Sequence, residues 1–422
     1  MAKRRKNKNK NIILVIFIII IIIAIAIFIP EILKKETVVQ TDETKMIDLR
    51  EKSISDVNFY AEQYKLNLTI EYAYSDQIPA DKVISQSIAS GNPIKENDNL
   101  IVVFSKGKVN KEQLKADNIN ELGKIPVMMY HGIVNVASSS TGNTGGNVDK
   151  SGYDRTSEAF REDLEFYYKE GYQMIRLIDY VNQNIDVAYS KSPLVLTFDD
   201  GKENNIKVTG LDEAGNIIID ENSAVGILES FKKKYPDYNV TATFFINSGL
   251  FNQPEYNEKI IKWLVNNNYD IGNHTRNHVD FKTVTSSKTE DEVGYMYQKL
   301  EELIPGKYVN IVALPFGSPY STSHENFSHI LNGSYNDITY ETVSTLRVGW
   351  EADASPYDVD FDKTFIKRIR AYDHDGTSSD IKMNFNILKT KKYISDGDVN
   401  TVVIPEKDKD RVITTNKTII TY

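Results

Sequence analysis

The longest apolar run in the chain lies close to its start. Residues Ile12–Ile29 contain no polar side chain, and the basic segment Met1–Lys10 precedes them. These eighteen residues would rise about 27 Å as a helix, close to the roughly 30 Å hydrocarbon core of a bilayer. We therefore expect residues 1–34 to be a cytoplasmic basic tail and a transmembrane anchor, with the rest of the chain outside the cell membrane. A cleaved signal peptide is the alternative, but no A-x-A-like site follows the run.

A short module is predicted for residues 44–107. Helical spacing over Ser55–Tyr64 gives way to alternating and apolar runs that are typical of strands. Three such runs begin at Leu66, Val83 and Leu100. Residues 108–124 are charged and predict a linker that is partly helical.

From Ile125 onward, helical and strand-like patterns alternate, which predicts an α/β fold with a parallel sheet. Its most apolar run, Leu194–Gly201, ends in Asp199 and Asp200. A buried strand of this kind delivers both carboxylates to the C-terminal edge of the sheet, where α/β folds place their chemistry. Residues 380–422 are polar and strand-prone, and they predict a β-rich appendage.

Composition excludes several classes of function. The net charge is −9 and no sustained basic face occurs beyond the N-terminus, which argues against nucleic acid as a partner. The chain has no cysteine, so disulfides, thiolate nucleophiles, cysteine-ligated metals and a lipid anchor on cysteine are all excluded.

Two histidines stand four residues apart in the stretch Ile271–His278, and this spacing predicts that His274 and His278 share one side of a helical turn. With Asp200 they make a His₂-carboxylate set that leaves a position open for water, as catalytic zinc sites do. Thr275 stands where the H-E-x-x-H metalloproteases carry their glutamate base, which argues against a protease.

The T-F-D-D-G run that ends at Gly201 and the H-T-x-x-H run together resemble the motifs of the NodB-homology polysaccharide deacetylases, carbohydrate esterase family four. The resemblance implies an irregular (β/α) barrel over residues 125–379. It implies Asp199 as the general base and Asp200, His274 and His278 as ligands of a divalent metal, most simply Zn²⁺.

Another apolar strand ends in His131, within Ile125–Gly132. The family's L-x-H motif, which carries the general acid, has no convincing counterpart downstream, and members that open with a Met-Tyr-His strand look circularly permuted. The resemblance therefore implies His131 as the acid, with His374 as its rival. A histidine suits this task because its ordinary pKa of about 6.5 allows proton donation near neutrality.

The chain departs from the family pattern at Ala313, which stands where an arginine would brace the catalytic aspartate. Arg347 could replace that arginine. The resemblance further implies that the backbone N–H of Phe316 stabilises the oxyanion and that Trp350 and Asp353 line the acetyl pocket.

The short module resembles a PASTA domain in Val83-Ile-Ser-Gln-Ser and Val103-Phe-Ser-Lys-Gly107, which implies attachment to peptidoglycan; a plain spacer is the alternative. We expect a metal-dependent N-deacetylase that acts on N-acetylglucosamine units of peptidoglycan or of an exported poly-N-acetylglucosamine. The alternative is a catalytically impaired, membrane-anchored receptor for peptidoglycan, since the bracing arginine is missing.

Overall fold

A computed structural model of the chain describes residues 44–137 and 145–422. They form two compact units, one ending at Val109 and the other beginning at Asn110. Within these described ranges, no helix is both long enough and apolar enough to cross a bilayer. The predicted span Ile12–Ile29 lies outside them.

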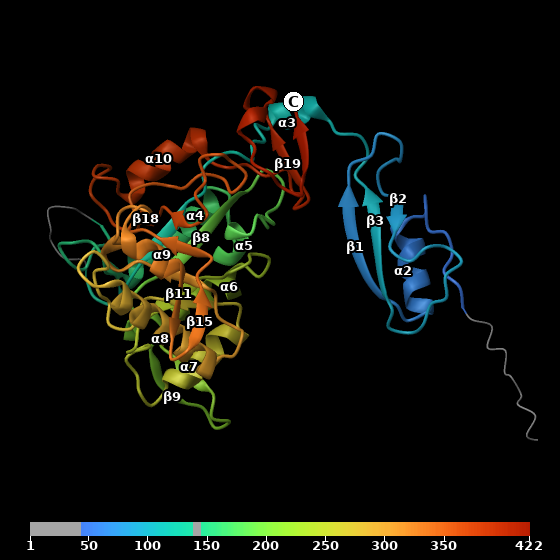
Figure 1. The fold of residues 1–422 in the computed structure, drawn as a ribbon. Helices are drawn as coiled ribbons and strands as arrows, with labels where there is room; N and C mark the ends of the chain where they lie inside the picture. Colours follow the sequence, from blue (N-terminus) through green and yellow to red (C-terminus); the bar gives the residue numbers. More distant parts are fainter. Residues whose placement is uncertain (1–43, 138–144) are drawn as a thin grey trace, which may run out of the picture. The chain divides into compact units, whose positions relative to one another are not determined.

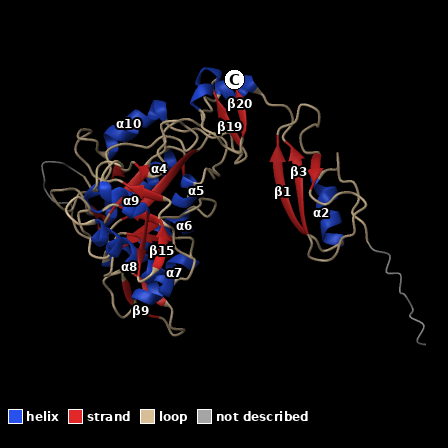
Figure 2. Cartoon of the chain, viewed as in Figure 1, coloured by secondary structure: helices blue, strands red, loops and turns tan. Residues whose placement is uncertain are grey.

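The smaller unit has the predicted order of one helix followed by three strands. Its elements are α2 (Ile54–Gln63), β1 (Asn67–Ala73), β2 (Val83–Gln86) and β3 (Asn99–Ser105). Strand β3 lies between the other two, parallel to β1 and antiparallel to β2, and α2 packs beside the sheet (Figure 2). Val57, Leu100, Val102 and Phe104 make a core with almost no solvent exposure, so this unit has an interior of its own.

The larger unit is an α/β domain with a parallel half-barrel sheet, as the alternating pattern predicted (Figure 1). Its strands are, in sheet order, β17 (Phe365–Ile366), β16 (Ser344–Leu346), β13 (Ile311–Ala313), β12 (Asp270–Asn273), β11 (Thr243–Ile246), β8 (Ser192–Phe198), β4 (Val127–Tyr130) and β18 (Ile369–Arg370), with β7 (Tyr172–Met174) also on β8. Each strand pair in this sheet is parallel.

One short segment bridges the two ends of the sheet. Residues 365–366 pair with β16, and after only two further residues 369–370 pair with β4 at the opposite end. The sheet is therefore curved enough for a six-residue stretch to reach both of its edges. Lys367 and Arg368 lie in the gap between the two pairings.

Helices pack against this sheet through a shared apolar core to which α4, α6, α7, α8 and α10 contribute. The helices of the unit are α3 (Lys111–Ala116), α4 (Ser157–Lys169), α5 (Leu177–Val181), α6 (Ala224–Lys234), α7 (Asn257–Asn266), α8 (Ser286–Leu303), α9 (Glu325–Leu331) and α10 (Ile381–Lys391). Two-stranded ribbons lie outside the sheet: β5 (Ile133–Val134) with β6 (Arg155–Thr156), β9 (Val208–Leu211) with β10 (Ile217–Ile219), β14 (Asn332–Tyr335) with β15 (Ile338–Glu341), and β19 (Thr401–Ile404) with β20 (Thr418–Thr421).

The C-terminal residues differ from the expected β-rich appendage. Residues 381–391 form helix α10, whose Phe385 and Leu388 join the core beside α4. Tyr393 and Val402 belong to a second cluster of buried apolar residues, which also contains Ile125 and Val127. Helical spacing of Ile381, Phe385 and Leu388 is the cause, because it gives this polar segment one apolar face that the domain buries.

Candidate metal centre and catalytic site

Asp199 and Asp200 follow directly on β8, whose residues are all buried. The Asp199 N–H donates to the Tyr130 carbonyl at 2.9 Å, so Asp199 continues the sheet. Asp200 then adopts a left-handed backbone conformation with φ 76°. Gly201 is also left-handed, and a Cβ there would lie 2.0 Å from the Leu250 carbonyl oxygen, so only glycine allows the sharp turn that separates the two carboxylates.

The two histidines follow β12 in a loop, and the predicted helical turn is wrong. Thr275 and His278 have positive φ angles of 66° and 54°, which no helix permits. The side chain of Asn273 shapes the loop by accepting from the Thr275 N–H at 2.8 Å and donating to the Val293 carbonyl at 2.9 Å. The loop still places the two imidazole rings together, with centroids 4.8 Å apart.

Asp200, His274 and His278 converge on one point, as the sequence predicted. Their potential ligand atoms all lie within 4.8 Å of one another, and Asp200 Oδ1 is 3.2 Å from His274 Nε2 and 3.5 Å from His278 Nε2. Among the described residues, the buried His274 Nε2 has no hydrogen-bond partner of proper geometry. These donors fit a divalent metal, because two imidazole nitrogens and a carboxylate are the set that catalytic zinc sites use.

His274 is oriented for this role by its other nitrogen. Nδ1 lies 2.8 Å from the Ala313 carbonyl oxygen, and donation to this oxygen leaves Nε2 as the lone-pair nitrogen that faces Asp200. Position 313 therefore contributes through its backbone. No arginine side chain is needed there for this contact.

The electrostatics of the site favour a cation. Burial alone would raise the pKa of Asp200, but its interactions with the neighbouring His274, His131 and His278 outweigh burial and lower that pKa. Burial alone would lower the pKa of His274, yet the two aspartates raise it. Burial is also the main cause that lowers the pKa of His278. The centre thus combines an ionised carboxylate with imidazoles in a negative field, which suits a metal ion.

Asp199 is braced by Arg368, which the sequence analysis did not single out. The guanidinium donates to both carboxylate oxygens of Asp199, at 2.8 and 2.7 Å, and also to Thr197 Oγ1. Arg368 is 0% exposed and Asp199 2%. Burial alone would raise the pKa of Asp199, but Arg368 and the nearby histidines lower it, so the carboxylate stays ionised.

The suggestion that Arg347 replaces the missing arginine is wrong. Its guanidinium lies over the Phe365 ring, 5.1 Å from the centroid, and only its carbonyl serves the brace, by accepting from Arg368 Nε at 2.6 Å. Arg368 reaches Asp199 because it lies in the segment that bridges the two sheet ends, from which a long side chain can extend inward. The sequence could have predicted a buried arginine here, because Arg368 lies between Ile366 and Ile369 in a strand-like run, and apolar neighbours indicate burial.

His131 follows β4 and lies in the same site. It is 9% exposed, and its Nδ1 is buried without a hydrogen-bond partner in the described part of the chain. Burial lowers its pKa, while Asp199 and Asp200 partly oppose that shift. The ring of Tyr153 packs edge-on against it at 5.0 Å. His374 is elsewhere, in a loop where its Nδ1 pairs with Thr377 Oγ1, and no contact joins it to the described metal-binding residues.

Lys202 is a second residue that the sequence analysis missed. Its Nζ lies 2.8 Å from Asp154 Oδ1 and 3.9 Å from Asp200 Oδ2. It therefore ties the loop that carries Tyr153 to the turn that carries the metal-binding carboxylate. Only its position two residues after Asp200 could have suggested this role from the sequence.

Phe316 and Trp350 are both exposed, and only Phe316 contacts the metal-binding group. Phe316 has φ 59°, and its ring lies edge-on to His278 at 4.7 Å, so its backbone is close to the metal-binding group. Trp350 is 65% exposed, and its backbone N–H donates to the Arg368 carbonyl at 2.6 Å. No ring contact joins Trp350 to the described metal-binding side chains.

Asp353 is not part of this site. Its N–H donates to the Ile125 carbonyl, at the start of β4, whereas His131 follows the end of that strand, six residues or roughly 20 Å further. Its carboxylate accepts from the N–H groups of Ala354 and Lys367, and burial raises its pKa to about 6. Trp350 lies beside the same part of the sheet, because its backbone N–H donates to the Arg368 carbonyl, directly before the segment that pairs with Met128.

Each of the two units matches a known protein family. Residues 186–330 match the polysaccharide deacetylase family and residues 44–106 match the PASTA domain family. No curated protein sequence matches the chain. A Streptococcus pyogenes deacetylase in complex with acetate has 18% identity and a TM-score of 0.44, covering 64% of this chain and 99% of its own.

Two other solved structures are similar to parts of the chain. A de-N-acetylase from Aggregatibacter actinomycetemcomitans has 12% identity and a TM-score of 0.38, covering 58% of this chain and 94% of its own. The three-PASTA-domain region of a Staphylococcus aureus Ser/Thr kinase has 17% identity and a TM-score of 0.15, covering 31% of this chain and 81% of its own.

Proposed function

Since the chain carries a polysaccharide deacetylase domain behind an N-terminal PASTA domain, we propose that it is a metal-dependent N-deacetylase of N-acetylglucosamine units in peptidoglycan. The observation that carries the proposal is the Asp199–Arg368 pair beside the metal-binding group. A structural metal site needs Asp200 alone. A second carboxylate, held ionised at the same point, is what a hydrolytic reaction needs as a base.

The residues present divide the reaction among themselves. Asp200, His274 and His278 would hold a divalent cation, Zn²⁺ by their donor types, which when bound lowers the pKa of water and polarises a carbonyl. Asp199 accepts the proton of the attacking water. His131 donates a proton to the departing amine; burial lowers its pKa, and the charges of Asp199 and Asp200 oppose that shift and favour the protonated form that this step needs.

The backbone around Phe316 supports the same proposal. The left-handed conformation at Phe316 and the contact of its ring with His278 bring this turn next to the metal-binding group. We propose that the Phe316 N–H donates to the oxyanion that forms on the acetyl carbon. Such a donor is worth roughly 3 kcal/mol of barrier in other acyl-transfer enzymes.

Location and substrate are part of the proposal. The apolar run Ile12–Ile29 with its basic flank favours an N-terminal anchor and a deacetylase domain outside the cell membrane. The PASTA domain favours peptidoglycan, with poly-N-acetylglucosamine as the second substrate to be tested. The receptor alternative depended on a missing cation beside Asp199 and on the displaced general acid; Arg368 provides a cation beside Asp199, and His131 lies near the same carboxylate.

Acetate release by residues 35–422, measured from purified peptidoglycan and from chito-oligosaccharides with and without a chelator, tests the proposal. We expect chelator-sensitive release that Asp199→Asn abolishes and that the exposed control Asp237→Asn leaves unchanged. If zinc binds and neither polymer yields acetate, while the protein still sediments with cell wall, the receptor alternative replaces the deacetylase.

A further inference from the structure

Arg370 ends the segment that bridges the two sheet ends, and it lies close to the candidate general acid. Its guanidinium carbon is 5.2 Å from the centroid of the Tyr153 ring, and that ring packs edge-on against His131 at 5.0 Å. Two residues earlier, Arg368 holds the base Asp199. Arg370 therefore stands at the rim of the site, one aromatic ring away from His131.

Two tyrosines hold the guanidinium in place. Besides Tyr153, the ring of Tyr372 lies under it, with 3.8 Å between the guanidinium carbon and the ring centroid. Tyr372 is 5% exposed, and its hydroxyl donates to the Ser378 carbonyl. Gly152 makes room for this ring, because a Cβ there would come within 2.8 Å of the Tyr372 side chain. An arginine stacked in this way is preorganised and loses little conformational freedom when it binds a ligand.

The charge of Arg370 has no carboxylate partner in the described part of the chain. Its Nη1 donates at 3.0 Å to the Ser151 carbonyl, a neutral acceptor, and this bond is solvent-exposed. Stacking uses the faces of a guanidinium and leaves N–H groups at its edge, which match the oxygens of a carboxylate or phosphate. The neighbouring cations are already paired: Arg368 with Asp199, Arg155 with Asp163 and Asp373, and Lys202 with Asp154.

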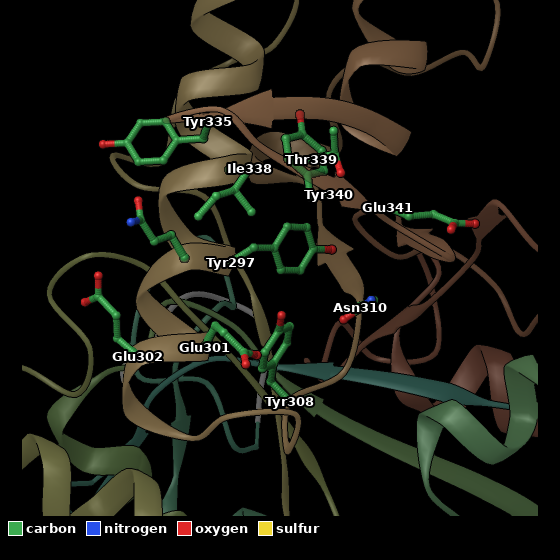
Figure 3. Close-up of a pocket in the computed structure, with 12 residues that line it drawn as sticks. Tyr297, Glu301, Glu302, Tyr308, Asn310, Tyr335, Ile338, Thr339, Tyr340 and Glu341 are labelled. Atoms are coloured by element: carbon green, nitrogen blue, oxygen red, sulfur yellow. The ribbon is translucent and has the colours of Figure 1, made fainter.

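The cavity beside α8 is acidic, in contrast to this rim. Its volume is about 360 Å³, and it lies between α8 and the β14–β15 hairpin (Figure 3). Its lining includes Glu301, Glu302 and Glu341, and none of the described residues that line it is a lysine, an arginine or a histidine. An anionic glycan is therefore repelled there and attracted to the rim that carries Arg370.

We propose that Arg370 makes the deacetylase domain selective for acidic glycans, by binding a carboxylate or phosphate on the sugar unit that is deacetylated or on the unit next to it. The inference rests on the proposed function and narrows its substrate. In peptidoglycan, a carboxylate is present on the lactyl ether of muramic acid where no peptide is attached, and a phosphate where an anionic polymer is attached. Poly-N-acetylglucosamine carries neither group, so Arg370 favours peptidoglycan over it.

Steady-state acetate release by the full-length chain from two pairs of soluble tetrasaccharides tests the inference. One pair is a peptidoglycan tetrasaccharide with free lactyl carboxylates and its methyl ester. The other is N-acetylglucosamine tetramer with and without one phosphate ester. We expect kcat/KM to be about tenfold higher for the charged member of at least one pair, mainly through a lower KM, because the anion is bound before the reaction begins.

Three variants assign the preference to one side chain. Arg370→Gln should lose it, and Arg370→Lys should keep part of it, because the charge stays while the planar fork is lost. The matched control Arg161→Gln, whose guanidinium bonds to Asn222, should keep it in full. If the loss of stacking shifts Tyr153, both members of a pair are affected alike, so the ratio within each pair is the measure.

Equal kcat/KM within both pairs, or a preference that survives in Arg370→Gln, would overturn the inference. A preference within only one pair supports it and identifies the anion as carboxylate or phosphate. Added salt should reduce the preference, because the contact is exposed to solvent. A preference that salt leaves unchanged also counts against an ionic contact.

Binding separates this inference from the proposed function. Isothermal titration of the same tetrasaccharides measures the preference without any reaction. If no tetrasaccharide yields acetate, but a charged one binds more tightly than its neutral partner and Arg370→Gln removes the difference, the role of Arg370 stands and the deacetylase proposal fails. If acetate is released equally well from the charged and neutral members of both pairs, only the role of Arg370 fails.

Discussion

Replacement of Arg368 by methionine should destabilise the protein severely, because it leaves the Asp199 carboxylate buried without its cation. Asp199 is 2% exposed and both of its oxygens are bonded to Arg368. Removing one partner of a buried ion pair costs about 3–5 kcal/mol. Urea unfolding of residues 35–422, followed by tryptophan fluorescence, should show the loss as a lower midpoint with an unchanged slope.

The double variant Arg368→Met/Asp199→Asn isolates the cause. It removes the unpaired charge, so it should be more stable than Arg368→Met alone, although acetate release stays lost. The penalty should also shrink as the pH falls, because burial without Arg368 raises the pKa of Asp199 and a protonated carboxyl carries no charge. Arg347→Met is the matched control and should cost under about 1 kcal/mol, since that arginine only stacks on a ring.

Two results would refute this reasoning. One is an Arg368→Met protein that unfolds at the same urea concentration as the unmodified chain. The other is a double variant no more stable than the single one, which would mean that lost packing and not the unpaired charge sets the penalty.

Three further predictions concern the metal, the acid and a remote carboxylate. His274→Asn should reduce zinc binding by more than about a hundredfold, measured by metal analysis after dialysis, since it removes a buried ligand; full occupancy would contradict its assignment. Tyr153→Ala should move the basic limb of the pH–rate profile to higher pH, because burial lowers the pKa of His131 and the ring contributes to that burial, whereas Tyr153→Phe should leave the limb in place. Asp353→Asn should flatten the pH dependence of stability in metal-free protein. Asp353 has a pKa of about 6 when folded and about 3.9 when unfolded, so its contribution is full below pH 4 and declines by about 3 kcal/mol as the pH rises through 6; equal slopes in both proteins would refute it.

The metal-binding group and the residues around it could be predicted from the sequence because each lies directly after an apolar, strand-like run. Asp199 and Asp200 end an apolar strand, and His131 ends another, so the apolar pattern alone predicts both at one edge of a parallel sheet. The histidine pair was also expected there, although a loop and not a helical turn brings the rings together.

The residues that sequence reasoning placed wrongly depend on long-range pairing. Arg368 is 169 positions from Asp199, and only the bridging of the sheet ends makes them neighbours. Asp353 was expected to line the acetyl pocket, but its N–H bonds the Ile125 carbonyl just before β4. The helical part of 380–422 was hidden because Met383 and Ile387 fall between the residues of its apolar face and obscure the helical period.

The segment that bridges the sheet ends also fixes when the site can be completed during synthesis. A chain made only as far as residue 364 already has His131, Asp199, Asp200, His274 and His278, yet it lacks the cation that keeps Asp199 ionised. Edge pairing on both sides and the catalytic brace arrive within the same six residues. Closure of the sheet and the bracing of Asp199 therefore depend on the same short stretch of chain.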